Sequence, residues 1–257
     1  MTMIKNICRG TISAWEMLLD IPLPRQVQRF QDQQCTPAET AAGFVAVGVL
    51  TGLVFYLLGT ILNISHLDKH VAAFLFAALL LIANEYKDSG RGLRLLTSGA
   101  GQWFSGAGFI QAFSTASSAP GNREHNITSV YILLTGIALY FLALHHKLFW
   151  CAAIFTAGTT LQMLIATLPR SIQQMPYLPM EKEDFQMVKL LLAVILILLF
   201  LNFPGMTIAA VLANWCFARY LYGKMKNNGI PATADQITLA GKIAELITLL
   251  CALLFMF

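Results

Sequence analysis

Charged residues are scarce in this sequence. They make up 12% of the 257 residues, whereas hydrophobic residues make up 57%. A soluble domain carries about 25% charged residues, so this deficit, together with apolar runs of roughly 20 residues, predicts an integral membrane protein. The alternation of apolar and polar residues that is typical of a strand is also missing. Because lipid offers the backbone no hydrogen bonds, we predict that helices cross the membrane.

Several sequence signals of other protein classes are missing as well. The five cysteines are scattered without a CxxC pair or the spacing of a metal site, so we interpret them as small buried hydrophobes. The N-terminus has no basic segment followed by an apolar run and a small-residue cleavage site, so we expect no cleaved signal peptide. The Gly/Ser-rich segment 97–121 lacks the Lys-Ser/Thr pair of a P-loop, and we interpret it as an insertion within the polar segment 85–127.

The apolar segments predict seven membrane spans in a single membrane domain, 1–257. These spans are 41–62, 68–84, 129–146, 149–168, 186–202, 205–222 and 237–257, and only the turn NFPG separates the fifth from the sixth. Lysine and arginine are more frequent in alternate connecting segments. The positive-inside rule then places the N-terminus in the cytoplasm and the C-terminus outside. The partner implied is the lipid bilayer, and no nucleic acid is expected.

The first residues have a different pattern. Within 1–18, apolar residues recur at helical spacing from Ile4 to Leu18, while Lys5 and Arg9 lie away from that stripe. This pattern is typical of an amphipathic helix that lies in the membrane interface. The prolines in IPLPR at 21–25 end it.

The last predicted helix, within 223–257, has a polar face. Asp235, Thr238, Lys242 and Glu245 follow one another at spacings of three, four and three residues, which places them on one face of a helix. One interpretation is that Lys242 and Glu245 neutralise each other and hold helices together. The other is that the stripe forms the wall of a cytoplasm-facing site, because ionisable residues inside a membrane are functional by default.

Further candidate residues lie on either side of the segment 85–127. Glu85 and Asp88 are three residues apart at the end of the second span and could share a hard cation such as Mg²⁺. Arg91 nearby, and Arg123 beside Glu124 before the third span, carry charge suited to a phosphate. The alternative is that these charges lie next to the membrane and only fix the orientation of the spans.

These pieces occur in an order that resembles cobalamin synthase, the adenosylcobinamide-GDP ribazoletransferase family. The resemblance is strongest at the two ends, in IPLPR and in the closing ARYLYGKMKNNGIPATADQITLAGKIAELITLL. In that family the closing stretch carries a Thr-Gly-Asp-Thr motif followed by glutamates in the last helix. Thr233, Asp235 and Glu245 match this pattern, whereas Ala234 replaces the glycine and Lys242 replaces a glutamate.

The resemblance implies a transferase that joins α-ribazole, or its 5′-phosphate, to adenosylcobinamide-GDP with loss of GMP. It implies a Mg²⁺-dependent site at the cytoplasmic side of a bacterial or archaeal inner membrane. Carboxylates would hold the metal on a pyrophosphate, and cations would stabilise the leaving phosphate. The implied catalytic residues are Asp88, Glu124, Asp235 and Glu245, the substrate-binding residues are Arg91, Arg123 and Lys242, and the metal ligands are Glu85, Asp88 and Asp235.

Two other functions stay open. The family has an Asp-rich motif after the second span, and this chain has only Glu85 and Asp88 there. That loss favours a non-catalytic paralogue that holds pathway enzymes together at the membrane, as a homo-oligomer or in a complex. A small transporter would need polar residues in several spans or broken helices in paired halves, but intramembrane charge lies mainly in the last span. The leading hypothesis is therefore a transferase with a nucleotide-activated small molecule as substrate.

Overall fold

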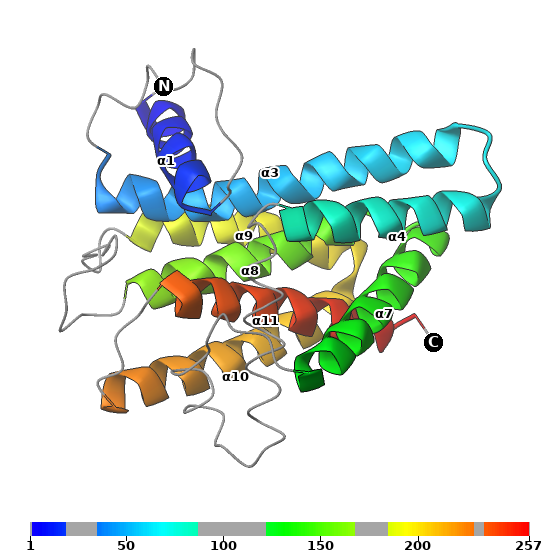
Figure 1. Cartoon of the computed structure of the whole chain (residues 1–257). Coiled ribbons are helices and arrows are strands. Elements are labelled where there is room, and N and C mark those ends of the chain that lie inside the picture. Colours follow the sequence, from blue (N-terminus) through cyan, green and yellow to red (C-terminus); the bar gives the residue numbers. More distant parts are fainter. Residues whose placement is uncertain (1, 19–34, 87–121, 168–184, 229–233, 257) are drawn as a thin grey trace.

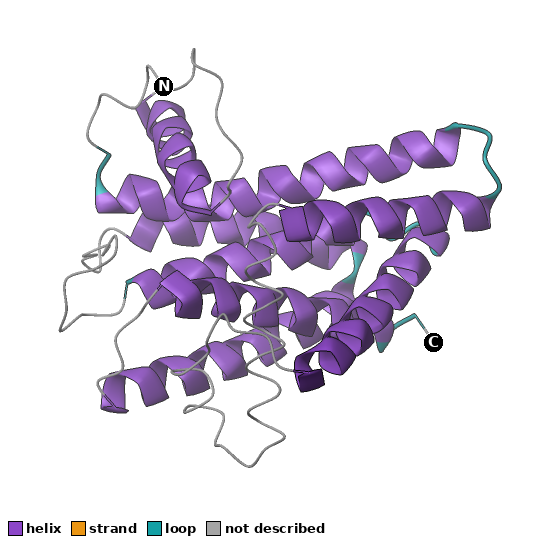
Figure 2. Cartoon of the chain, in the orientation of Figure 1, coloured by secondary structure: helices purple, strands orange, loops and turns teal. Residues whose placement is uncertain are grey.

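The computed structural model describes residues 2–18, 35–86, 122–167, 185–228 and 234–256 (Figure 1). Side chains are described over 6–15, 18, 35–84, 131–167, 185–223 and 236–256. Every regular element in these residues is a helix, and Figure 2 shows no strand among them. The helices are α1 (Thr2–Leu18), α3 (Pro37–Ile64), α4 (Lys69–Tyr86), α7 (Asn122–Leu144), α8 (Trp150–Ala166), α9 (Phe185–Asn202), α10 (Pro204–Asn228) and α11 (Ala234–Leu253). The predicted all-helical fold class is confirmed.

Local sequence signals explain where several helices begin and end. The α3 helix begins with a capping box, in which the Thr36 hydroxyl accepts a hydrogen bond from the Glu39 backbone N–H and the Glu39 carboxylate accepts one from the Thr36 N–H. Pro37 occupies its first turn, where the missing N–H costs nothing. The α9 helix ends at Asn202 and α10 begins at Pro204, so the predicted break at NFPG is confirmed.

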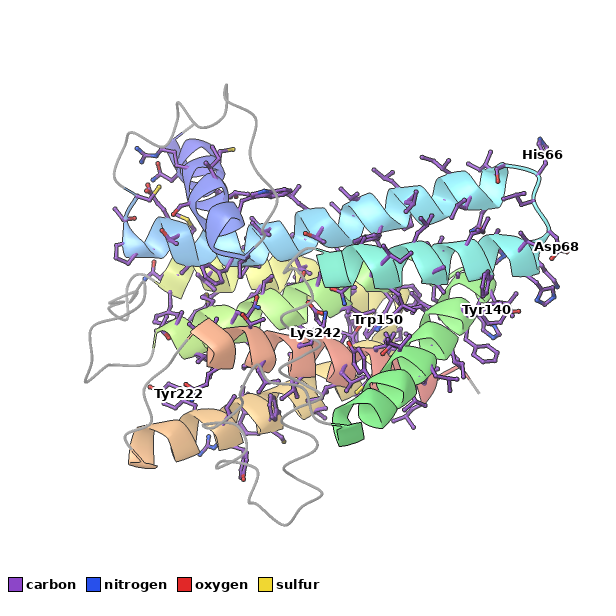
Figure 3. All side chains as sticks on the ribbon, in the orientation of Figure 1. His66, Asp68, Tyr140, Trp150, Tyr222 and Lys242 are labelled. Carbon is purple, nitrogen blue, oxygen red and sulfur yellow. The ribbon has the colours of Figure 1, made fainter. Side chains whose placement is uncertain are left out.

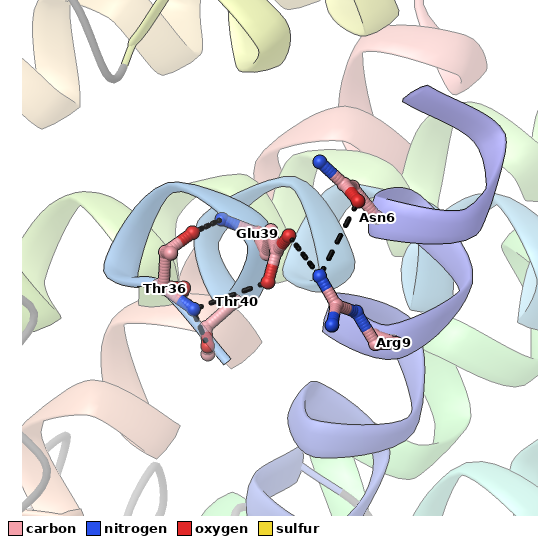
Figure 4. A network of polar contacts seen from close by, with 5 residues as sticks. All are labelled: Asn6, Arg9, Thr36, Glu39 and Thr40. Carbon is pink, nitrogen blue, oxygen red and sulfur yellow. Dashed lines mark hydrogen bonds and ion pairs between the residues drawn. The ribbon is translucent and has the colours of Figure 1, made fainter. Parts of the chain in front are cut away.

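The predicted N-terminal helix is present as α1, and it crosses α3 at a steep angle (Figure 1). The crossing is close because glycines meet there: a Cβ on Gly43 would lie 2.0 Å from the carbonyl oxygen of Gly10. Beside it, Nη2 of Arg9 donates to Oε1 of Glu39 at 2.8 Å and to Oδ1 of Asn6 at 3.3 Å (Figure 4). The capping carboxylate of α3 therefore also binds α1, across 30 residues of sequence.

The centre of the bundle is α8, which packs between α3 and α11. A Cβ on Gly52 of α3 would lie 2.3 Å from Cα of Ala152, so the two backbones touch. Trp150 and Phe155 of α8 are buried completely or nearly so, and the Phe155 ring stacks on Phe55 at a centroid distance of 5.3 Å. The α7 helix lies obliquely against α4 (Figure 1). Tyr140 of α7 and His70 of α4 are hydrogen-bonded there at 2.6 Å.

Three helices in the described part of the chain are long and apolar enough to cross a membrane: Pro37–Ile64, Phe185–Asn202 and Gln236–Leu253. Lys69–Asn84, Tyr131–Leu144 and Trp150–Ala166 are apolar but shorter. Large hydrophobic side chains are exposed along the bundle, and only 17% of the 18 residues of α9 are buried. These features are compatible with a membrane protein, as the composition predicts.

Candidate functional site

A buried ionic pair lies near the middle of α11. Nζ of Lys242 is 3.9 Å from Oε2 of Glu245, one helical turn away, and the two side chains are only 2% and 7% exposed. Figure 3 shows Lys242 on the ribbon in the interior of the bundle. Because ionised groups in an apolar interior are costly unless they are paired, the pairing explains how α11 carries both. The helical spacing predicts this pairing, and the structure shows it.

Three helices meet at Glu245. Nδ2 of Asn84, from the end of α4, donates to Oε2 of Glu245 at 3.4 Å. On the α8 side, a Cβ added to Gly158 would lie 2.7 Å from Cγ of Glu245, so the glutamate packs directly on the α8 backbone. About one turn earlier the contact is reversed: the Gln162 side chain of α8 packs on the α11 backbone at Gly241, where a Cβ would lie 2.6 Å from it. Small residues thus let polar side chains fit between closely packed helices.

The polar stripe of α11 continues past Glu245. The Thr248 hydroxyl donates to the Ala244 carbonyl oxygen at 2.9 Å and accepts from Nδ2 of Asn214, on α10, at 2.8 Å. The indole Nε1 of Trp150 donates to the Thr248 carbonyl oxygen at 3.2 Å. The stripe thus joins α11 to α4, α8 and α10 by polar contacts.

Sequence reasoning missed Asn84, Gln162 and Asn214. Each is the only Asn or Gln in its predicted span. Amides in such a position hydrogen-bond across helices, because the membrane offers no other partner. That signal identifies them as polar contacts but does not identify their partners.

The other predicted site residues have positions in the helices, but their side chains lie outside the described set. Glu85 is in the last turn of α4, Arg123 and Glu124 are in the first turn of α7, and Asp235 is in the first turn of α11. Asp88 and Arg91 lie outside the described residues altogether.

The structure does position the end of α4 and the start of α11 relative to Glu245. Asn84 brings the end of α4 to Glu245, and both α4 and α11 contact α7. Asp235 precedes Glu245 by ten residues, which is about 15 Å along the helix axis. The structure therefore brings Lys242, Glu245 and the end of α4 together, and it places the start of α11 about three turns away.

The described part of this site does not fit a divalent metal ion. Mg²⁺ is held by one or two carboxylates together with waters, but the carboxylate described here already has the Lys242 ammonium beside it. No group of three His, Cys, Asp or Glu side chains that could hold a metal occurs among the described residues. The ligands predicted for Mg²⁺, Glu85, Asp88 and Asp235, have side chains outside that set, so this assignment stays a prediction.

The fold and the site together define a class: a helical protein with membrane-type helices and a buried lysine–glutamate pair at a junction of three helices. Comparisons of the chain with protein-family models, with curated proteins and with solved structures find no match.

Proposed function

We propose that the protein is a multi-pass membrane transferase acting on a nucleotide-activated small molecule, in the manner that its resemblance to cobalamin synthase implies. The acceptor would be α-ribazole or its 5′-phosphate, the donor adenosylcobinamide-GDP, and the leaving group GMP. One observation carries the proposal: α11 holds Lys242 and Glu245 buried beside Asn84. A membrane helix bundle gains nothing in stability from such charges over apolar residues of similar size, which favours a functional role for them.

The chemistry of the pair suits phosphoryl transfer. In that reaction the acceptor hydroxyl oxygen forms a bond to phosphorus, the pyrophosphate bond breaks, and GMP leaves with the bridging oxygen. Lys242 supplies a fixed positive charge for the phosphate oxygens, and Glu245 accepts the hydroxyl proton. The arrangement differs from the family pattern in that a lysine stands in place of a glutamate, so a protein cation takes a position where the family has a carboxylate.

We also propose the seven-span topology with the N-terminus in the cytoplasm and the C-terminus outside, in a bacterial or archaeal cytoplasmic membrane. The three long apolar helices and the three shorter ones support it, and the remaining predicted span, 205–222, lies within the helix α10. Fusing a reporter that is active only in the cytoplasm to either end tests it. Activity at the N-terminus alone is the expected result, and equal activity at both ends would contradict it.

Turnover is the test of the transferase. The purified protein in nanodiscs would be incubated with adenosylcobinamide-GDP, α-ribazole 5′-phosphate and Mg²⁺, and GMP release would be measured. We expect release that is lost in Glu245→Gln, Lys242→Met and Asp235→Asn but kept in Lys189→Met, which removes an exposed lysine of α9. Chelating the Mg²⁺ tests the predicted metal requirement in the same assay.

A second function has one observation in its favour. Lys242 and Glu245 neutralise each other within one helix, as a purely structural pair would. This favours a non-catalytic paralogue that holds pathway enzymes together at the membrane. A folded, monodisperse protein that releases no GMP, and that retains pathway enzymes when purified in mild detergent, would decide for this second function.

A further inference from the structure

A cavity of about 320 Å³ lies between α8, α9, α10 and α11. Its walls are almost entirely apolar and include Trp150 of α8 and Trp215 of α10. It is roughly twice the size of a 150 Å³ cavity that holds benzene, and it is within the ordinary range for ligand sites, about 300–1,000 Å³. No charged side chain in the described part of the chain lines it.

Three oxygen atoms on the residues that line this cavity stand out. Oγ1 of Thr156, Oγ1 of Thr160 and Oδ1 of Asn214 are buried and have no hydrogen-bond partner among the described residues. Thr156 is only 5% exposed as a whole residue. Buried polar atoms nearly always have partners, so each exception calls for an explanation. These three oxygens have in common that they belong to residues lining a single cavity.

The amide of Asn214 is held in one orientation. Its Nδ2 donates to the Thr248 hydroxyl at 2.8 Å and to the Ala210 carbonyl oxygen at 3.0 Å. Both amide hydrogens are used, so Oδ1 is left as an acceptor only. A ligand group that donates one hydrogen bond and accepts another, such as a hydroxyl, matches Asn214 together with the two threonines.

The cavity lies next to the outer surface of the bundle. A second, shallower hollow lies between α9 and α10, and its walls share Leu196, Thr207 and Val211 with the cavity. Because these side chains line both spaces, the cavity and the hollow are adjacent. The α9 helix is also the least buried of the three long apolar helices. An apolar molecule dissolved in the bilayer could therefore reach the cavity between α9 and α10.

We propose that this cavity binds a neutral long-chain or isoprenoid alcohol that enters from the bilayer between α9 and α10. Asn214 Oδ1 accepts the hydrogen bond of the ligand hydroxyl, and the hydroxyls of Thr156 and Thr160 bind the ligand oxygen. The apolar chain lies along Trp150 and leaves through the hollow on the outer face. A neutral headgroup is favoured over a phosphate, because none of the described residues that line the cavity carries a positive charge to offset that of a phosphate. Neither Lys242 nor Glu245 lines this cavity, and the proposal does not rest on the transferase.

Tryptophan fluorescence provides the test. Trp150 is completely buried, yet it lines the cavity, so a bromine atom inside the cavity would quench it. The full chain with Trp15, Trp103 and Trp215 each changed to Phe leaves Trp150 as the single emitter. In nanodiscs, a dibrominated octadecanol should quench it in a saturable way at a mole fraction where phosphatidylcholine with the same brominated chain does not.

Variants in that background identify the polar contacts. Thr156→Val removes an oxygen that has no partner in the protein, so the fold should tolerate it, and the apparent affinity for the alcohol should fall about tenfold. Asn214→Leu should have a similar or larger effect. Thr51→Val is the control, because that hydroxyl bonds only within α3, to the Val47 carbonyl oxygen, and it should leave quenching unchanged.

Two outcomes would overturn the proposal. Equal quenching by the alcohol and by the phospholipid would mean that any acyl chain fills the cavity. No quenching by either, in a protein with a normal unfolding transition, would mean that the cavity is closed to lipid.

Discussion

The Lys242–Glu245 pair allows a quantitative prediction. At 3.9 Å and an effective dielectric constant near 20, the attraction between the two charges is about 4 kcal/mol. Lys242→Met keeps the length of the side chain and removes its charge. Glu245→Gln keeps an oxygen that can accept from Asn84 and removes the other charge. Because each single change leaves one buried charge without its counterpart, each should lower the free energy of unfolding by about 3 kcal/mol.

The double variant should behave differently. With both charges gone, neither partner is left uncompensated, and the free energy of unfolding should return to within about 1 kcal/mol of the parent protein. Reversible unfolding in mixed detergent and dodecyl sulfate, followed by far-ultraviolet circular dichroism, measures all four states of this cycle. Lys189→Met is the control for the chemical change, since Lys189 is exposed, and it should alter stability by no more than about 0.5 kcal/mol.

Two results would refute this reasoning. If either single variant matched Lys189→Met, the pair would not be buried and charged as its geometry indicates. If the double variant lost as much as the two single variants combined, the two charges would contribute independently and the coupling would be absent.

Three further predictions concern the scaffold. Gly52→Ala should lower the free energy of unfolding by about 2 kcal/mol, because its Cβ would lie 2.3 Å from the α8 backbone. Gly223→Ala, whose Cβ would have nothing within 4 Å, should raise it by about 0.5–1 kcal/mol. Equal effects of the two variants in thermal unfolding would contradict the close contact between α3 and α8. Thr36→Ala should lower the free energy of unfolding by about 1 kcal/mol because it removes the N-cap of α3, whereas Thr36→Ser keeps the capping hydroxyl and should keep the stability. Indistinguishable melting curves for Thr36→Ala and Thr36→Ser would argue against the capping box. Burial, and secondarily the charge of Glu39, raises the pKa of the Cys35 thiol above its ordinary 9.0, so its maleimide labelling rate should still be climbing above pH 9; a rate that levels off below pH 9 would rule this out.

Much of the local structure can be predicted from the sequence, because the signals involved span only a few residues. The break at 202–205 follows from proline chemistry, and the start of α3 follows from the Thr-x-x-Glu pattern of Thr36 and Glu39. The pairing of Lys242 with Glu245 follows from the 3.6-residue period of a helix. In each case the interacting groups are at most four residues apart.

The contacts that build the site could not be predicted in the same way. Asn84 is 161 residues from Glu245, and Arg9 is 30 residues from Glu39. An apolar helix in a bundle offers several faces of nearly equal hydrophobicity, so spacing alone does not say which helix it packs against.

The amino-acid sequence by itself therefore determined that the chain is helical and apolar, where several helices begin and end, and that α11 carries a lysine and a glutamate on one face. Only the tertiary structure decided that α4 delivers an amide to that glutamate, that Gly158 and Gly241 seat α11 on α8, and that a cavity remains beside Asn214. The physical reason is the range of the forces involved. Helix geometry and capping act within one or two turns, whereas the fit between helices depends on the shapes of side chains that the chain brings together from far apart.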